Sequence, residues 1–116
     1  YNLVVREPES SGLLAYCQEQ DLFLVAWRPV EKGALSVQEV PLITELREKY
    51  QKTPAQLAIN WLTSQSHVLT LSKTRSLAHL EENLGAIAWE MEGEDIERLR
   101  REYPRQQEQS GAVPLG

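Results

Sequence analysis

The chain is poor in the residues that build disulfides, metal sites and membrane spans. It contains one cysteine and two histidines among 116 residues. The lone Cys17 cannot form an internal disulfide, so we expect a reducing compartment and place the protein in the cytoplasm. Two isolated histidines and one cysteine lack the spacing of metal ligands. No apolar run approaches the ~20 residues that a membrane-spanning helix needs, and no signal peptide opens the chain.

Basic residues are also in the minority. The chain carries 12 Lys and Arg against 17 Asp and Glu, which gives a formal net charge of -5 at pH 7. An acidic surface repels phosphate backbones, so a nucleic acid is not expected as a general partner. This balance leaves room for one local basic pocket. The first residue is Tyr1 rather than Met, so we expect that upstream residues are missing.

Short apolar runs alternate with amphipathic segments along the chain. Leu22–Trp27 is typical of a strand covered on both faces in a parallel sheet, Val68–Ser72 is predicted as a second strand, and Tyr1–Val5 is interpreted as the end of another strand. Caps and periodicity predict five helices. The first starts at Ser10 or Ser11 and runs to about Gln20, the second starts at Pro41, and the third starts at the capping box Thr53–Gln56. The fourth runs from Ser76 to Gly85, which is predicted as a left-handed stop, and the fifth runs from Gly93 to Tyr103.

This order of elements predicts an α/β fold made of parallel units. Two or three strands cannot close a sheet, whereas an eight-stranded (β/α)8 barrel needs about 250 residues. We therefore predict a partial TIM barrel, the last strands and helices only, over residues 1–103. A polar tail is predicted over residues 104–116.

The candidate site lies where the two predicted strands end, because α/β barrels place their chemistry at the C-terminal ends of the strands. The first strand is followed by Trp27, Arg28, Pro29, Val30, Lys32 and Gly33, and the second by Ser72, Lys73, Thr74, Arg75 and Ser76. Cations and hydroxyls ahead of a helix N-terminus suit a phosphate group. The alternative is a solvated turn with a good helix cap.

Single residues in and around this site also have two interpretations. Trp27 is either a flat wall for a planar ring or a core residue at a strand end. His79, in the first turn after Ser76, either belongs to the phosphate site or is an exposed helical histidine. We interpret His67 and Cys17 as structural, and Trp61 and Trp89 as packing residues. Glu81, Glu82, Glu92, Glu94 and Asp95 are interpreted as solvated, and no catalytic constellation is found.

Three longer stretches carry a family resemblance: Leu22–Pro29 (LFLVAWRP), Thr53–Trp61 (TPAQLAINW) and Leu71–Ala86 (LSKTRSLAHLEENLGA). Together they resemble the C-terminal region of the aldo-keto reductase family, from Tyr1 to about Arg100. That family is an eight-stranded α/β barrel that reduces aldehydes and ketones with a nicotinamide cofactor. The resemblance therefore implies NADP(H), a small-molecule carbonyl substrate, and no membrane or nucleic acid.

The same resemblance implies a role for each candidate residue. Trp27 takes the place of the aromatic that stacks on the nicotinamide ring, and Arg28, Pro29 and Val30 lie where a loop runs along the pyrophosphate. Lys73 and Thr74 match the positions that hold the 2′-phosphate, next to Ser72, a further cofactor-binding residue, and His79 falls where an arginine often completes that grip. Glu82 and Asn83 match the pair that binds the adenine edge. Arg28 departs from the usual small hydroxyl residue, and a histidine at 79 is largely neutral at pH 7.

The resemblance also implies that the chemistry lies elsewhere. The family's catalytic aspartate, tyrosine, lysine and histidine come from earlier strands, so this chain alone is expected to be inactive. One hypothesis makes it part of a complete NADP-dependent reductase. The other makes it a truncated, non-catalytic α/β module that self-associates to bury its open strand edges.

Overall fold

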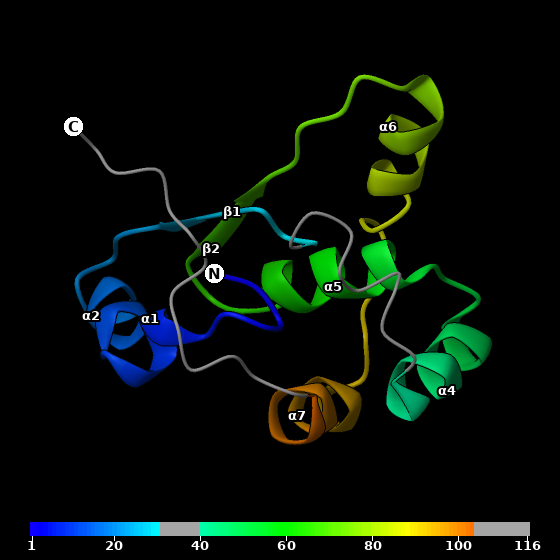
Figure 1. The fold of residues 1–116 in the computed structure, drawn as a ribbon. Helices are drawn as coiled ribbons and strands as arrows, with labels where there is room; N and C mark the ends of the chain where they lie inside the picture. The colour runs from blue at the N-terminus through cyan, green and yellow to red at the C-terminus, as the bar shows by residue number, and fades with distance from the viewer. Residues whose placement is uncertain (31–39, 104–116) are drawn as a thin grey trace.

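The structure is a computed structural model that describes residues 1–30 and 40–103. These residues form six helices and two strands (Figure 1). In chain order the elements are α1 (Glu7–Ser10), α2 (Leu13–Glu19), β1 (Leu24–Trp27), α4 (Pro41–Tyr50), α5 (Pro54–Thr63), β2 (Val68–Leu71), α6 (Leu77–Leu84) and α7 (Gly93–Glu102). The predicted tail, Lys32 and Gly33 lie outside the described residues. The alternation of strands and helices confirms the predicted α/β class.

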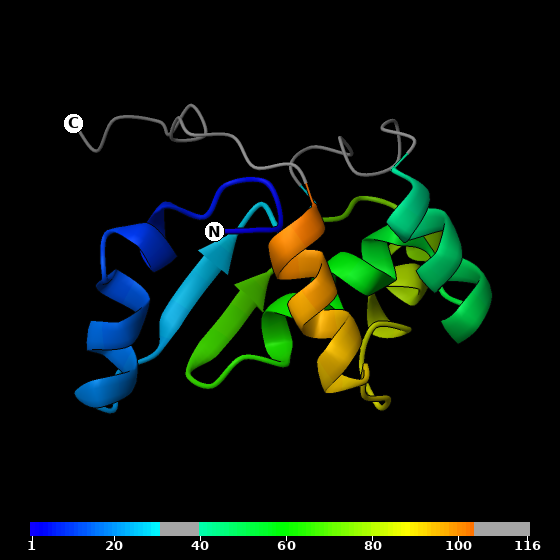
Figure 2. The same cartoon turned by 90° about the horizontal axis from the view of Figure 1, so that it is seen from below.

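The two strands form a parallel sheet in which Leu24 pairs with Val68 and Trp27 pairs with Leu71. Both predicted strands are therefore present, each shorter than expected. Figure 2 shows them running in the same direction, with α1 and α2 beside β1 and the other helices beyond β2. A parallel pair needs a long crossover, which the segment from α4 through α5 supplies.

Among the described residues, the two faces of this sheet are covered unequally. Ala26 and Val68 point into the core, whereas Val25, Trp27, Leu69 and Leu71 lie on the other face and are 43% to 63% exposed. The prediction that Leu22–Trp27 is covered on both faces was therefore wrong for the described residues. The exposed face borders an open groove that residues of α6 and the end of α5 also line.

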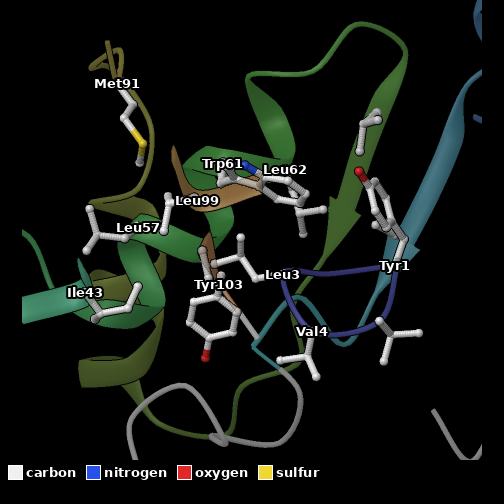
Figure 3. Packing of buried hydrophobic residues seen from close by; sticks show 14 of the residues in the cluster. Tyr1, Leu3, Val4, Ile43, Leu57, Trp61, Leu62, Met91, Leu99 and Tyr103 are labelled. Atoms are coloured by element: carbon white, nitrogen blue, oxygen red, sulfur yellow. The ribbon is translucent and has the colours of Figure 1, made fainter. Parts of the chain in front are cut away.

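The core forms where α5, α7 and the N-terminal loop meet. Trp61 on α5 is fully buried, its ring centroid lies 5.7 Å from that of Tyr1, and its Nε1 donates to the Ile96 carbonyl at 3.2 Å. Figure 3 shows Trp61 and Tyr103 on either side of Leu3 and Leu99. These contacts confirm the interpretation of Trp61 as a packing residue, and they attach the start of the chain to its last described helix.

Helix starts are the best predicted local features. Thr53 and Gln56 form the expected capping box: the Gln56 amide donates to Thr53 Oγ1 at 3.2 Å and the Thr53 amide donates to Gln56 Oε1 at 2.9 Å. Ser76 caps α6, where its Oγ accepts from the His79 amide at 3.4 Å. Pro41 begins α4 as predicted, with Leu42, Ile43 and Leu46 buried. These signals are local, so the sequence carries them directly.

Two predictions near the N-terminus were wrong. The expected helix from Ser10 to Gln20 is split into α1 and α2, because Gly12 between them adopts a left-handed conformation with φ of 82°. Residues 1 to 4 form a loop and Val5 makes only an isolated β-bridge, so the expected strand end is not present. The Oδ1 atom of Asn2 accepts from the amides of Val4 and Val5, both at 2.8 Å, which holds this loop.

Gly85 follows α6 as predicted, but its conformation was predicted wrongly. Its φ is -67°, in the right-handed helical region, so no left-handed stop requires a glycine here. A Cβ at this position would lie 2.3 Å from Nε2 of Gln56. A side chain at this position would therefore displace the Gln56 amide, which caps α5 and contacts α6.

Candidate functional site

The parallel register brings both predicted site segments to one edge of the sheet. Trp27 and Leu71 are direct partners at the C-terminal ends of β1 and β2. The residues that follow them therefore leave the sheet side by side, as expected for parallel strands. All ten predicted cofactor-binding residues lie within the described part of the chain: Trp27, Arg28, Pro29 and Val30 after β1, Ser72, Lys73 and Thr74 after β2, and His79, Glu82 and Asn83 on α6.

Trp27 lies at the surface of this edge. Its side chain is 43% exposed, so the interpretation of Trp27 as a core residue is not what the structure shows. The guanidinium carbon of Arg28 lies 4.3 Å from the centroid of the Trp27 ring. This separation is well within the ~6 Å range of a cation–π contact. One aromatic surface at the strand end is therefore present, and it carries a neighbouring cation.

The backbone after β1 is held in an unusual conformation. Arg28 has a φ of 55°, in the left-handed region that side chains rarely adopt. The Nδ2 of Asn2 donates to the Arg28 carbonyl at 3.0 Å, and Asn2 is 1% exposed. Pro29 is buried and Val30 packs at the margin of the core. The buried asparagine thus stabilises the turn that places Arg28 over Trp27.

The segment after β2 is tied to α6. Asn83 Nδ2 on α6 donates to Ser72 Oγ at 2.9 Å. Thr74 Oγ1 accepts from the Ser76 amide at 3.2 Å and donates to the Ser76 carbonyl at 3.0 Å. These bonds close a small loop at the start of the helix, so the positions of residues 72–76 are set by α6.

The charges at this loop suit an anion at its outer side. Lys73, Arg75 and His79 are exposed and lie around the N-terminal turn of α6, where free amides and the helix dipole add positive potential. Glu82 is half-buried, and its carbonyl accepts from Nε2 of Gln56 at 2.9 Å. The arrangement provides cationic donors for a phosphate on one strand end and an aromatic face for a ring on the other.

Two residues that support this site were not predicted. Asn2 and Gln56 contact it from 26 residues away along the chain, through the Arg28 carbonyl and the Glu82 carbonyl. Neither residue carries a sequence signal for such a contact. Gln56 was assigned only to its capping box, and Asn2 only to a strand end.

Other polar groups lie away from the candidate site. His67 precedes β2 and contacts Ser66 Oγ through Nδ1 at 2.6 Å and Asp21 Oδ1 through Nε2 at 2.7 Å, which joins the two loops that enter the strands. Cys17 is buried, as expected. Asp95 was expected to be solvated but is 2% exposed. It was misassigned because its partners Lys49 and Tyr50 are distant in sequence.

The described residues set two further limits. No group of three or more histidine, cysteine, aspartate or glutamate side chains among them is placed to hold a metal ion. In residues 1–30 and 40–103, no helix combines the length and the apolar character needed to cross a membrane.

Comparison with known proteins places these features in a family. The model of the aldo/keto reductase family matches residues 1–103. Glyoxal reductase of Bacillus subtilis is 32% identical over 84 residues, which cover 72% of this chain and 29% of that protein. The chain spans about 30% of the uncharacterised oxidoreductase YtbE of the same organism, with 28% identity over 87 residues.

A solved structure also matches this chain over only part of its own length. An aldo/keto reductase from Klebsiella pneumoniae, crystallised with NADP and acetate, superposes with a TM-score of 0.78 at 28% identity. The match covers 95% of this chain and 40% of that one. The chain therefore spans less than half the length of each of these relatives, which agrees with the prediction that it is a portion of a barrel.

Proposed function

This chain belongs to the aldo/keto reductase family, and on that premise we propose that it is the NADP(H)-binding, C-terminal part of a reductase of aldehydes and ketones. The ten candidate residues hold the cofactor in this proposal. The catalytic groups come from strands outside this chain, so the 116 residues alone do not reduce carbonyl compounds. The cytoplasm remains our proposed location, on the basis of the single cysteine.

The observation that carries the proposal is the pairing of Trp27 with Leu71 at one sheet edge. It places an exposed indole next to a loop with two exposed cations, Lys73 and Arg75. An aromatic face and phosphate-binding cations at neighbouring strand ends form a donor set that fits a nicotinamide dinucleotide phosphate. The relative from Klebsiella pneumoniae, crystallised with NADP, supports this choice of ligand.

Each group has a distinct task in the proposed site. Trp27 supports the nicotinamide ring, and Arg28 with the loop after it neutralises the pyrophosphate. Lys73 binds the 2′-phosphate, aided by Ser72, Thr74 and His79, while Glu82 and Asn83 contact the adenine edge. When bound, the cofactor would supply hydride for the carbonyl carbon. The residues of this chain orient that cofactor and do not handle the proton.

The first test is a titration of the full chain with NADPH and, separately, with NADH. Binding is followed by tryptophan fluorescence, because Trp27 is exposed at the site whereas Trp61 is buried. We expect saturable quenching that is stronger for NADPH. Lys73→Met is expected to weaken NADPH binding by about 10- to 100-fold and NADH binding little, since a charged hydrogen bond to phosphate contributes about 1.5–3 kcal/mol.

A matched control comes from α7. Arg101 is a strongly exposed cation on α7 and is not one of the ten candidate residues, so Arg101→Met should leave both affinities unchanged. Equal loss of NADPH and NADH binding in Lys73→Met would contradict the 2′-phosphate role. Quenching by neither nucleotide would refute cofactor binding by this chain.

A second candidate function rests on the exposed apolar surface. Val25, Leu69, Leu71, Leu80, Leu84 and Ile87 line one groove between β2, α6 and the end of α5. An apolar surface of this kind is costly to leave in water. A non-catalytic module that self-associates through it would sediment as a dimer or larger species, with Leu69→Glu restoring the monomer. A folded monomer in the unmodified chain would rule this candidate out.

A further inference from the structure

The contact between Arg28 and Trp27 has a consequence for which ligands the site accepts. The two groups lie 4.3 Å apart, closer than the other four cation–π contacts among the described residues, which range from 5.0 to 5.6 Å. Trp27 is the only one of the tryptophans in these pairs that lies at the edge where the proposed ligand binds. The guanidinium therefore covers one face of the indole that is assigned to the nicotinamide ring.

The backbone that carries the guanidinium is held in place. Arg28 adopts the left-handed region at φ 55°, and the buried Asn2 donates to its carbonyl at 3.0 Å. Asn2 is itself fixed, because its Oδ1 accepts from two amides of the N-terminal loop. Asn2 thus holds the turn, and the Arg28 side chain packs over the indole of the preceding residue, Trp27. Only rotation of the side chain can remove the cation from this face.

From this arrangement we propose that Arg28 makes the Trp27 face selective for planar rings that carry a phosphate group. A ring alone must displace the guanidinium and offers it nothing in return. A ring with a phosphate offers a bidentate, charge-assisted partner, so the guanidinium leaves the indole and binds the anion. The inference rests on the proposed cofactor function and adds the residue that enforces selection at the ring end.

The exchange differs from simple neutralisation of the pyrophosphate. A cation that only attracts phosphate would strengthen charged ligands and leave uncharged rings unaffected. A cation that also covers the indole weakens uncharged rings, by about two- to fivefold for an exposed cation–π contact. Removing the guanidinium should therefore have opposite effects on the two ligand types, and this sign difference identifies the covering role.

The first experiment needs no cofactor. In the full chain carrying Trp89→Phe, acrylamide quenching reports Trp27, because Trp61 is buried. We expect Arg28→Met to increase quenching. Inorganic pyrophosphate, at ionic strength held constant with potassium chloride, should move the parent toward the quenching of that variant. Arg47→Met, which removes an exposed arginine on α4, should behave as the parent. Absence of the pyrophosphate response, or equal quenching in Arg28→Met and the parent, would overturn the proposal.

The second experiment compares two ligands that differ by one phosphate, reduced nicotinamide riboside and reduced nicotinamide mononucleotide. The parent should prefer the mononucleotide by about tenfold. Arg28→Met should bind the riboside two- to fivefold more tightly and lose the preference, whereas Arg28→Lys should keep part of it. Riboside binding that is unchanged or weaker in Arg28→Met would overturn the covering role.

The two proposals fail separately. Saturable NADPH binding without a pyrophosphate response would support the proposed function and overturn the role of Arg28. A pyrophosphate response in a chain that does not bind NADPH would refute the proposed function and support the exchange of the guanidinium between indole and anion.

Discussion

Gly85→Ala should destabilise the protein by displacing one side chain, Gln56. The added Cβ would lie 2.3 Å from Gln56 Nε2, so the amide must rotate away. Rotation breaks two hydrogen bonds, from Nε2 to the Glu82 carbonyl and from the Thr53 amide to Oε1, each 2.9 Å long. At about 0.5–1.5 kcal/mol per bond, the loss is about 1–3 kcal/mol. The lower entropy of the unfolded alanine chain offsets about 0.4–1 kcal/mol, which leaves a net cost near 1–2 kcal/mol.

A double-mutant cycle separates this cause from a general intolerance of alanine. Urea unfolding at pH 7, followed by circular dichroism, gives the free energy of unfolding of the parent, Gly85→Ala, Gln56→Ala and the double variant. In the Gln56→Ala background the clash is gone, so Gly85→Ala should become neutral or stabilise by up to about 1 kcal/mol. The same destabilisation in both backgrounds would refute the assignment of the glycine to this close approach.

Three further variants test other contacts. Arg6→Met should lower the free energy of unfolding in urea by about 3 kcal/mol, because the buried guanidinium donates to two carbonyls at the end of α7. An unchanged urea midpoint would exclude that role. Burial alone would raise the pKa of Asp95, but hydrogen bonds from Lys49 and Tyr50 hold it below its usual value. The stability from this lowered pKa is present above about pH 4 and is lost as the pH falls through the pKa of the folded state. Asp95→Asn should therefore flatten the acid side of a plot of the urea midpoint against pH. A curve parallel to that of the parent would contradict this. Thr53→Ala should cost about 1 kcal/mol in thermal unfolding, and Thr53→Ser, which keeps the hydroxyl, should cost clearly less.

The sequence predicted features that depend on neighbouring residues. The capping box at Thr53, the start of α4 at Pro41 and the cap of Ser76 all lie within one helical turn, and all three are confirmed. The two strands were also found, because a short apolar run bounded by helical segments is typical of a strand. From the parallel order alone, the strand-end residues could be expected at one edge, and the register places them there.

What failed depends on contacts distant in sequence. Asp95 looks like an ordinary first-turn acid, and only the fold brings Lys49 and Tyr50 against it. Gly85 looks like a left-handed stop, and only the packing of α6 on Gln56 shows why the position excludes a side chain. The role of Asn2 at the Arg28 carbonyl is of the same kind. The assignment of single residues to parts of the cofactor stays a prediction.

The attachment of the N-terminal loop to α7 also sets an order of events during synthesis. Arg6 is buried against the carbonyl of Leu99, 93 positions later in the chain. At about 5–20 residues per second, the ribosome needs roughly 5–20 seconds to make that partner. Until then the hydrogen bonds between Arg6 and α7 cannot form. The buried guanidinium therefore couples the completion of this part of the core to the synthesis of α7.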